Sequence, residues 1–191
     1  MATARVVWPF RISALQLGIA AIVLSAAWGG IIGFAAWKLG VPAEWQGLSV
    51  AVGLSSGIVG ARRTVRRYLA ALGMTGWMGP LRFQDDSLAQ TFALFWSIGG
   101  VASALVWADV LPSGLVRPGL VLSLLSLEAG SGAIAIDSAY RFVSFRRYQS
   151  ISGRRIVLIR TSWMGGQAWI ALEGSEAAPA IPVADSPMTR R

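Results

Sequence analysis

Glu128 is the residue of this chain whose setting points most directly to chemistry. It is a lone acid within a long apolar stretch, and it follows Arg117 by about 16 Å along a helix that rises 1.5 Å per residue. This spacing places it near the middle of a bilayer, where an acidic side chain is costly and usually functional. The neighbouring Ser126 and Ser131 lie among small residues, so a second helix or water could approach the carboxyl group.

Two interpretations of Glu128 follow. In the first, it is the proton or cation site of a small channel or transporter. In the second, it is a protonated carboxyl that hydrogen-bonds inside the bundle, to Ser55, Ser56, Ser97 or Ser103, or to another subunit. The first three apolar stretches carry no second acid in their middle, so a complete proton relay is not visible. The pattern favours the structural interpretation.

The remaining acids have simpler interpretations. Asp137 precedes Arg141 by four residues, the spacing of an ion pair on one helix face. Asp86 and Ser87 are both residues that cap helix N-termini. Ser87 and Gln90 also match the S-x-x-Q capping box. We therefore expect a helix to begin at this point.

The chain contains no cysteine and no histidine. This excludes disulfides, thiolate chemistry, His-based metal sites and the Ser-His-Asp or Cys-His catalytic arrangements. Asp85 and Asp86 are adjacent carboxylates, but no other acid joins them in a metal-binding pattern. We expect no catalytic residues, no cofactor and no metal, and hence no enzyme.

The elements that position these residues are apolar helices. Of the 191 residues, 54% are hydrophobic and only 14% are charged, against about 25% charged in a soluble domain. A span needs about 20 apolar residues, and four stretches qualify or nearly do. We predict an all-α membrane domain over residues 12–140, with two helical hairpins whose spans cover about 12–37, 44–61, 88–111 and 115–139.

The basic residues are divided unequally between the two ends of these spans. With the N-terminus (residues 1–11) inside, only Lys38 and Arg117 of the seventeen basic residues lie outside. Positive residues accumulate on the cytoplasmic side of membrane proteins. We therefore predict that both termini are cytoplasmic and that the protein resides in a bacterial inner membrane.

The C-terminal part differs from the spans in composition. Residues 141–173 form a basic cytoplasmic segment in which 155–160 and 167–172 read as the two strands of a β-hairpin. Such a hairpin is marginal in isolation, so we expect it to need a membrane surface or a partner. The proline-containing end, residues 174–191, is typical of a disordered tail.

The cytoplasmic surface is where we expect contacts with anionic headgroups or partners. Arginines at helical spacing extend the second span as far as a helix end near Gly73, and further arginines follow the fourth span. Two tail tryptophans suit interfaces. The expected contact residues are Arg62, Arg63, Arg66, Arg67, Arg146, Arg147, Trp163 and Trp169. Nucleic acid is not expected, because the arginines flank apolar helices.

Two classes of function remain compatible with these features. One is a non-catalytic structural or assembly subunit of a larger membrane complex, of the secretion, respiratory or photosynthetic type. Small-residue helix faces, including the Gly29 and Gly33 pair at GxxxG spacing, favour this class. The alternative is a small oligomeric channel or a proton- or cation-coupled transporter that uses Glu128.

Overall fold

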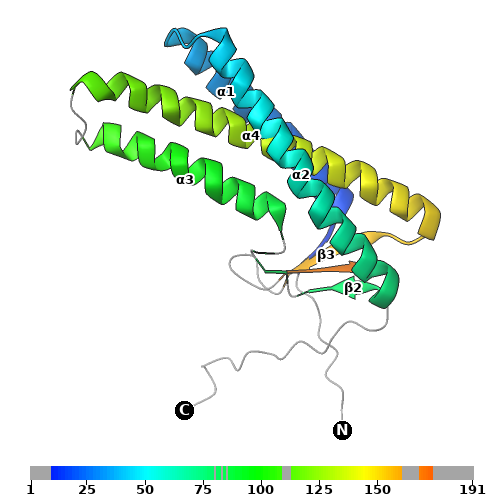
Figure 1. The fold of residues 1–191 in the computed structure, drawn as a ribbon. Helices are drawn as coiled ribbons and strands as arrows, with labels where there is room; N and C mark the ends of the chain where they lie inside the picture. Colours follow the sequence, from blue (N-terminus) through cyan, green and yellow to red (C-terminus); the bar gives the residue numbers. More distant parts are fainter. Residues whose placement is uncertain are drawn as a thin grey trace, which may run out of the picture.

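The protein is a bundle of four helices closed at one end by a small sheet (Figure 1). The computed structural model describes residues 10–79, 81–82, 84, 86–108, 113–160 and 168–173. The helices are α1 (Ala14–Lys38), α2 (Ala43–Thr75), α3 (Ser87–Trp107) and α4 (Ser113–Ser152). The strands are β1 (Phe10–Ser13), β2 (Trp77–Met78), β3 (Ile156–Arg160) and β4 (Ala168–Leu172). The expected disordered tail lies outside the described residues.

Helix α4 is the central element of the bundle. It packs against α1, α2 and α3, whereas α1 and α2 scarcely touch each other. Small residues allow these close approaches. A Cβ added to Gly53 or Gly57 of α2 would collide with the α4 backbone, and one on Gly99 of α3 would lie 2.7 Å from the side chain of Leu127. At these glycines the neighbouring helices therefore approach α4 closely.

The glycine pair of α1 serves the same packing. A Cβ on Gly29 would lie 3.3 Å from Ser131 Cβ, and one on Gly33 would lie 3.1 Å from Glu128 Oε1. Both glycines therefore face α4 of the same chain. Their GxxxG spacing is used for packing within the molecule.

Helix α2 continues well beyond its apolar part, as the arginine spacing indicated. It ends one turn later than expected, however. The left-handed C-cap residue is Gly76, with φ 76°, and its N–H donates to the carbonyl of Leu72 at 3.0 Å. The carbonyl of Gly76 in turn accepts from the N–H of Leu172 at 2.8 Å. The pairing of β2 with β4 thus fixes the chain reversal at Gly76 rather than at Gly73.

Helix α4 also extends past its apolar part, to Ser152. Arg141, Arg146 and Arg147 are thus helical, although the apolar pattern predicts an end near residue 139. The extension is held by Phe145, which is buried against residues of α2 and of the sheet. Burial of this apolar face stabilises the added turns.

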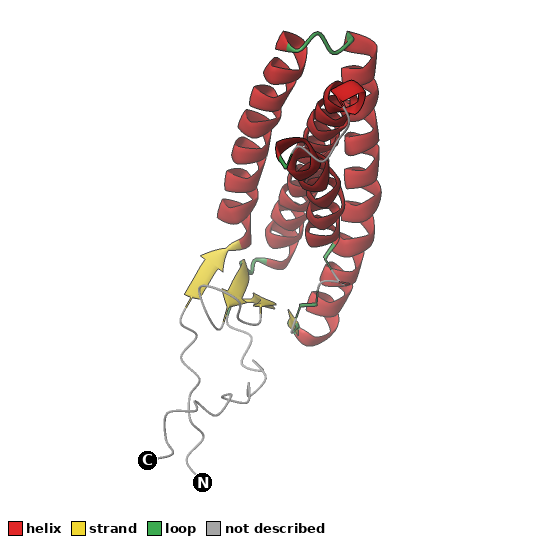
Figure 2. Ribbon diagram, turned by 90° about the vertical axis from the view of Figure 1, so that its left-hand side faces the viewer, coloured by secondary structure: helices red, strands yellow, loops and turns green. Residues whose placement is uncertain are grey.

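The sheet has four antiparallel strands in the order β1-β3-β4-β2 (Figure 2). The expected hairpin is confirmed as β3 and β4, but it forms the centre of a larger sheet. The segment before α1 and the connection after α2 supply the two edge strands. The hairpin therefore gains support from strands of its own chain.

Alternation along the strands gives the sheet two apolar faces. Ile156, Ile170 and Leu172 pack on Tyr68 and Leu72 of α2 in one buried cluster. The opposite face has a second cluster, consisting of Val157, Ile159, Trp169 and Ala171 with Trp77 against it. The first cluster joins the sheet to the helices as one packed unit.

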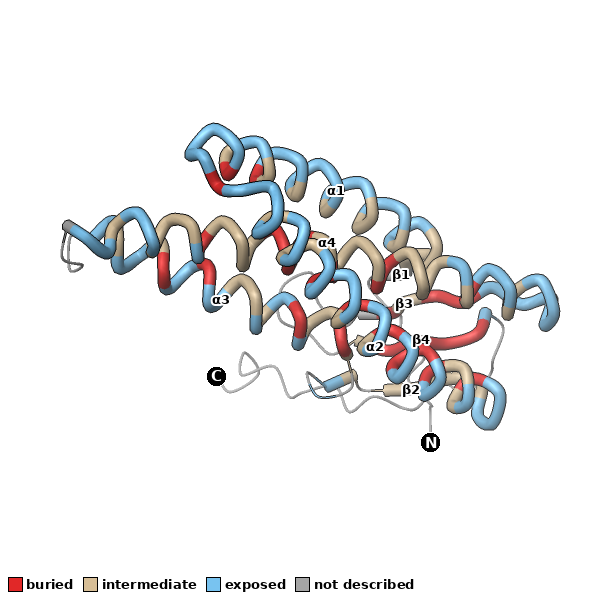
Figure 3. Tube along the Cα trace, turned by 45° about the horizontal axis from the view of Figure 1, so that its top comes forward, coloured by how far each residue is buried: buried red, intermediate tan, exposed pale blue. Residues whose placement is uncertain are grey.

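Three helices of the described chain are long and apolar enough to cross a membrane, namely α1, α3 and most of α4 (Gly114–Ser152). Helix α2 is not among them, because glycines, serines and four arginines lower its hydropathy. Exposed residues nevertheless line the outward side of all the peripheral helices (Figure 3). Large apolar side chains are among them, such as Leu24 at 69% exposure on α1 and Val59 at 71% on α2. Such surfaces are typical of contact with lipid or with other proteins.

Candidate functional site

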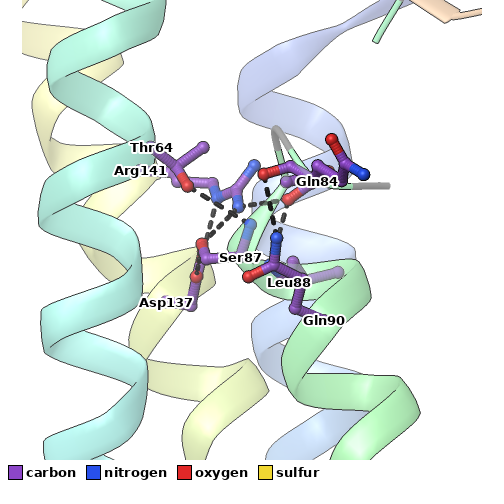
Figure 4. A network of polar contacts seen from close by, with 8 residues as sticks. Thr64, Gln84, Ser87, Leu88, Gln90, Asp137 and Arg141 are labelled. Carbon is purple, nitrogen blue, oxygen red and sulfur yellow. Dashed lines mark hydrogen bonds and ion pairs between the residues drawn. The ribbon is translucent and has the colours of Figure 1, made fainter. Parts of the chain in front are cut away.

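A cluster of polar side chains joins α2, α3 and α4 near the end of the bundle that carries the sheet (Figure 4). Asp137 of α4 is fully buried. It accepts hydrogen bonds from Arg141 Nε and from Ser87 Oγ, the latter at 2.5 Å. Arg141 Nη2 also donates to Asp86 Oδ1 at 2.5 Å. The expected pair of Asp137 and Arg141 is confirmed, and it belongs to a larger network.

The first residues of α3 carry this network. Asp86 is the N-cap residue and accepts from the Leu88 N–H at 3.0 Å. The backbone N–H of Ser87 donates to Thr64 Oγ1 at 3.2 Å. In a capping box with Ser87 as the N-cap residue, the side chain of Gln90 would accept a hydrogen bond from that N–H. The capping-box interpretation is therefore wrong, because Ser87 uses its donors to bind α2 and α4.

The charges of the cluster are unequal in number. Two carboxylates face one guanidinium, so the ionised cluster carries a net charge of −1. Tyr68 of α2 adds a cation–π contact, with its ring centroid 5.7 Å from the Arg141 Cζ atom. Charge-assisted hydrogen bonds, which are the stronger kind, thus tie α3 to α4. Helix α2 joins them through the Thr64 hydrogen bond and the Tyr68 cation–π contact. The described residues contain no group of acids able to hold a metal ion.

Glu128 lies at a second polar position, deeper in the bundle. It is 8% exposed, and its Oε2 atom has no hydrogen-bond partner among the described residues. Ser49 of α2 is close enough to interact with the carboxyl group, although its hydroxyl donates to the Leu125 carbonyl at 2.6 Å. A hydroxyl has one proton, so Ser49 cannot donate to Leu125 and to Glu128 at the same time. Oε2 of the carboxyl group thus lacks a donor among the described residues.

The serines considered as partners of Glu128 are used elsewhere. Ser103 and Ser123 share a hydrogen bond of 2.6 Å, and Ser56 donates to the carbonyl of Gly53. Ser55 and Ser97 are exposed. Within the expected site, Ser131 donates to the Leu127 carbonyl at 2.8 Å. Ser126 is half-buried and lies about 200° around the helix from Glu128.

No family model, curated protein or solved structure matches this chain. The geometry of its polar clusters and surfaces is therefore the basis for assigning a function.

The expected contact arginines are exposed on the parts of α2 and α4 that extend beyond their apolar stretches. Arg62, Arg63, Arg66 and Arg67 are exposed on α2, on the side opposite its buried residues Val65, Tyr68 and Leu72. Arg146 and Arg147 are exposed on α4. Two helices thus present arginines near the same sheet.

Of the two tail tryptophans expected to make contacts, the structure describes only one. Trp163 lies outside the described residues. Trp169 is only 6% exposed, and its ring centroid is 5.5 Å from that of Trp77 on β2. Its ring is therefore part of the packing of the sheet rather than of the exposed surface.

Proposed function

We propose that the chain crosses the membrane four times, with α2 as a full span. Helix α2 runs beside the middle of α4, since Ser49 bonds to Leu125 and Gly53 and Gly57 lie against Ala129 and Ala133. A helix held at that depth shares the bilayer with α4. Burial of its glycines and serines against α4 compensates for its low hydropathy.

The sheet gives independent support for four crossings. Strand β1 precedes α1 and strand β2 follows α2, yet both belong to one sheet with β3 and β4. A chain that leaves this end through α1 must come back through α2 before β2 can pair. The same reasoning applies to α3 and α4. Both ends of the described chain then lie on one side of the membrane. The positive-inside bias favours the cytoplasm for that side, and the membrane that we propose is a bacterial inner membrane.

Single introduced cysteines test this arrangement without background labelling, because the chain has no cysteine of its own. Leu39, Met74 and Ile151 are exposed by 48%, 80% and 78%. We expect Met74→Cys and Ile151→Cys to react with a membrane-impermeant maleimide only from the cytoplasmic side, and Leu39→Cys only from the outside. If Leu39→Cys and Met74→Cys react from the same side, α2 does not cross.

Within this arrangement, the function that we propose is that of a non-catalytic structural or assembly subunit of a larger membrane complex. The observation that carries this proposal is a pair of outward rows of small residues. Gly47, Ala51 and Ser55 are exposed on α2, and the exposed row on α3 consists of Ser97, Gly100 and Ala104. A Cβ on Gly47 or Gly100 would meet nothing within 4 Å. Such rows allow a further transmembrane helix to pack closely.

The experiment compares complexes purified in mild detergent. We expect the wild-type chain to copurify with other membrane subunits, and we expect Gly100→Leu to lose them because the row on α3 is filled. Val101→Leu is the matched control, because Val101 is the next residue along α3 and is 59% exposed outside the row. A wild-type chain that purifies only as a monomer, with no complex lost on deletion, would contradict the proposal.

A channel or a proton- or cation-coupled transporter is the second candidate. It is favoured by the unpartnered Oε2 of buried Glu128, since intramembrane acids often mark ion or proton pathways. The test is Glu128→Gln in proteoliposomes. Unchanged proton or cation flux relative to wild type would rule out this role.

The partners in this proposal are lipids and other membrane subunits. The exposed arginines near the sheet are suited to anionic headgroups, and the proposal includes neither nucleic acid nor catalysis.

A further inference from the structure

A pocket of about 230 Å³ lies where α1, α4, the start of α3 and the sheet meet. Its walls are mostly apolar, with Leu17 and Ala21 from α1, Leu88 from α3 and Leu158 from β3. Leu17 is 45% exposed, so the pocket is bounded on that side by a lipid-facing residue. Its volume equals that of roughly seven or eight water molecules at ~30 Å³ each, which suits part of one hydrocarbon chain.

Two polar groups of α4 belong to the wall of this pocket. Ser138 is 2% exposed, and its Oγ has no hydrogen-bond partner among the described residues. A buried hydroxyl without a partner is unusual and costly. Arg141 also lines the pocket. Its Nε and Nη2 atoms donate to the cluster around Asp137, whereas no such bond involves Nη1 in the described part of the chain.

These two donors favour a neutral acceptor. Arg141 already pairs with the carboxylates of Asp86 and Asp137, so it has no unbalanced positive charge to attract an anionic group into the pocket. A carbonyl oxygen can accept from both a hydroxyl and a guanidinium without adding charge. The ligand that matches the walls and the donors is therefore a hydrocarbon chain that ends in a carbonyl group.

The depth of the pocket identifies which carbonyl group this is, given the membrane placement proposed above. Ser138 lies about 15 Å along α4 from Glu128 at 1.5 Å per residue. Half of a hydrocarbon core of ~30 Å is the same distance. If Glu128 is at the midplane, Ser138 lies at the boundary where the acyl chains of a phospholipid join their ester groups.

We infer that this pocket binds the acyl ester of a bilayer phospholipid. One acyl chain occupies the apolar part between α1 and α3. The ester carbonyl accepts hydrogen bonds from Ser138 Oγ and Arg141 Nη1. Binding here does not depend on whether the chain assembles with other subunits, so the two ideas can fail separately.

The first test uses the unmodified protein. Native mass spectrometry measures the binding of diester and of diether phosphatidylcholine, which differ only in the carbonyl groups and avoid headgroup attraction to the arginines. We expect the diether lipid to bind roughly two- to tenfold more weakly, as for loss of one or two hydrogen bonds. Ser138→Ala should reduce that difference. Equal binding of the two lipids to wild type would overturn the inference.

The second test fills the pocket. Ala21→Phe should weaken diester binding by roughly tenfold, the effect of excluding about two methylenes. Ala20→Phe is the matched control, because Ala20 is exposed on the same helix and does not line the pocket. Equal weakening by both variants, or by neither, would also count against the inference.

Discussion

Replacing Arg141 with methionine should destabilise the bundle strongly. Methionine keeps much of the length of the side chain but removes its charge. Asp137 is fully buried and would retain Ser87 as its partner while losing its cation. Removing one member of a buried ion pair costs about 3–5 kcal/mol, since a buried charge is left uncompensated. Asp86 adds less to the loss, because its side chain is 27% exposed and still caps α3.

The free energy of unfolding in mixed detergent micelles measures this loss. Arg147→Met is the matched control, since this exposed arginine of α4 should change stability by only about 0.5 kcal/mol. Adding Asp137→Asn to Arg141→Met should recover about 2 kcal/mol, because the amide is neutral and can still accept from Ser87. If Arg141→Met and Arg147→Met have the same stability, the cluster does not hold the helices together as described.

Two further substitutions probe the packing. Gly57→Leu should lower the free energy of unfolding by at least about 1–3 kcal/mol, because the new side chain would collide with the backbone of Ala133, whereas Gly47→Leu meets open space and should lower it much less. SDS-induced unfolding of the two variants measures the difference, and equal losses would refute the close approach of α2 to α4. Trp169→Ala should cost about 3–5 kcal/mol by removing a buried aromatic, seen as a lower thermal unfolding temperature, while Trp107→Ala, at an 87% exposed position, should leave that temperature nearly unchanged.

Local patterns in the sequence predicted most of the individual elements. Apolar stretches predicted the helices, and the spacing of Asp137 and Arg141 predicted their ion pair. The β-branched run near Ile156 predicted the central hairpin. Each of these features depends on residues close together in the chain. Periodicity and propensity report such short-range structure.

The features that sequence reasoning missed depend on distant residues. Asp86 and Arg141 are separated by 55 positions, and no local pattern indicates their contact. The edge strands β1 and β2 are four and two residues long, too short for a strand signal of their own. They form because β3 and β4 offer edges to pair with. A capping aspartate beside an apolar stretch was the one available signal of the network.

Ser87 illustrates how tertiary contacts override a local motif. Its sequence matched a capping box, yet its hydroxyl donates to Asp137 at 2.5 Å. A bond to a buried carboxylate is stronger than a neutral cap, so the long-range partner prevails. The helix still begins where expected, because Asp86 supplies the cap instead.

The two buried acids of α4 differ in how far their carboxyl oxygens are hydrogen-bonded within the fold. They are nine residues apart and so lie about 180° apart around the helix, with Asp137 facing α2 and α3 and Glu128 facing α1 and α2. Both oxygens of Asp137 accept hydrogen bonds, whereas Oε2 of Glu128 accepts none in the described structure. Neutralising Asp137 therefore removes the buried carboxylate that pairs with Arg141, while neutralising Glu128 breaks no such ion pair among the described residues. A change in ion flux in Glu128→Gln would for this reason report on the carboxyl group itself rather than on a loosened bundle.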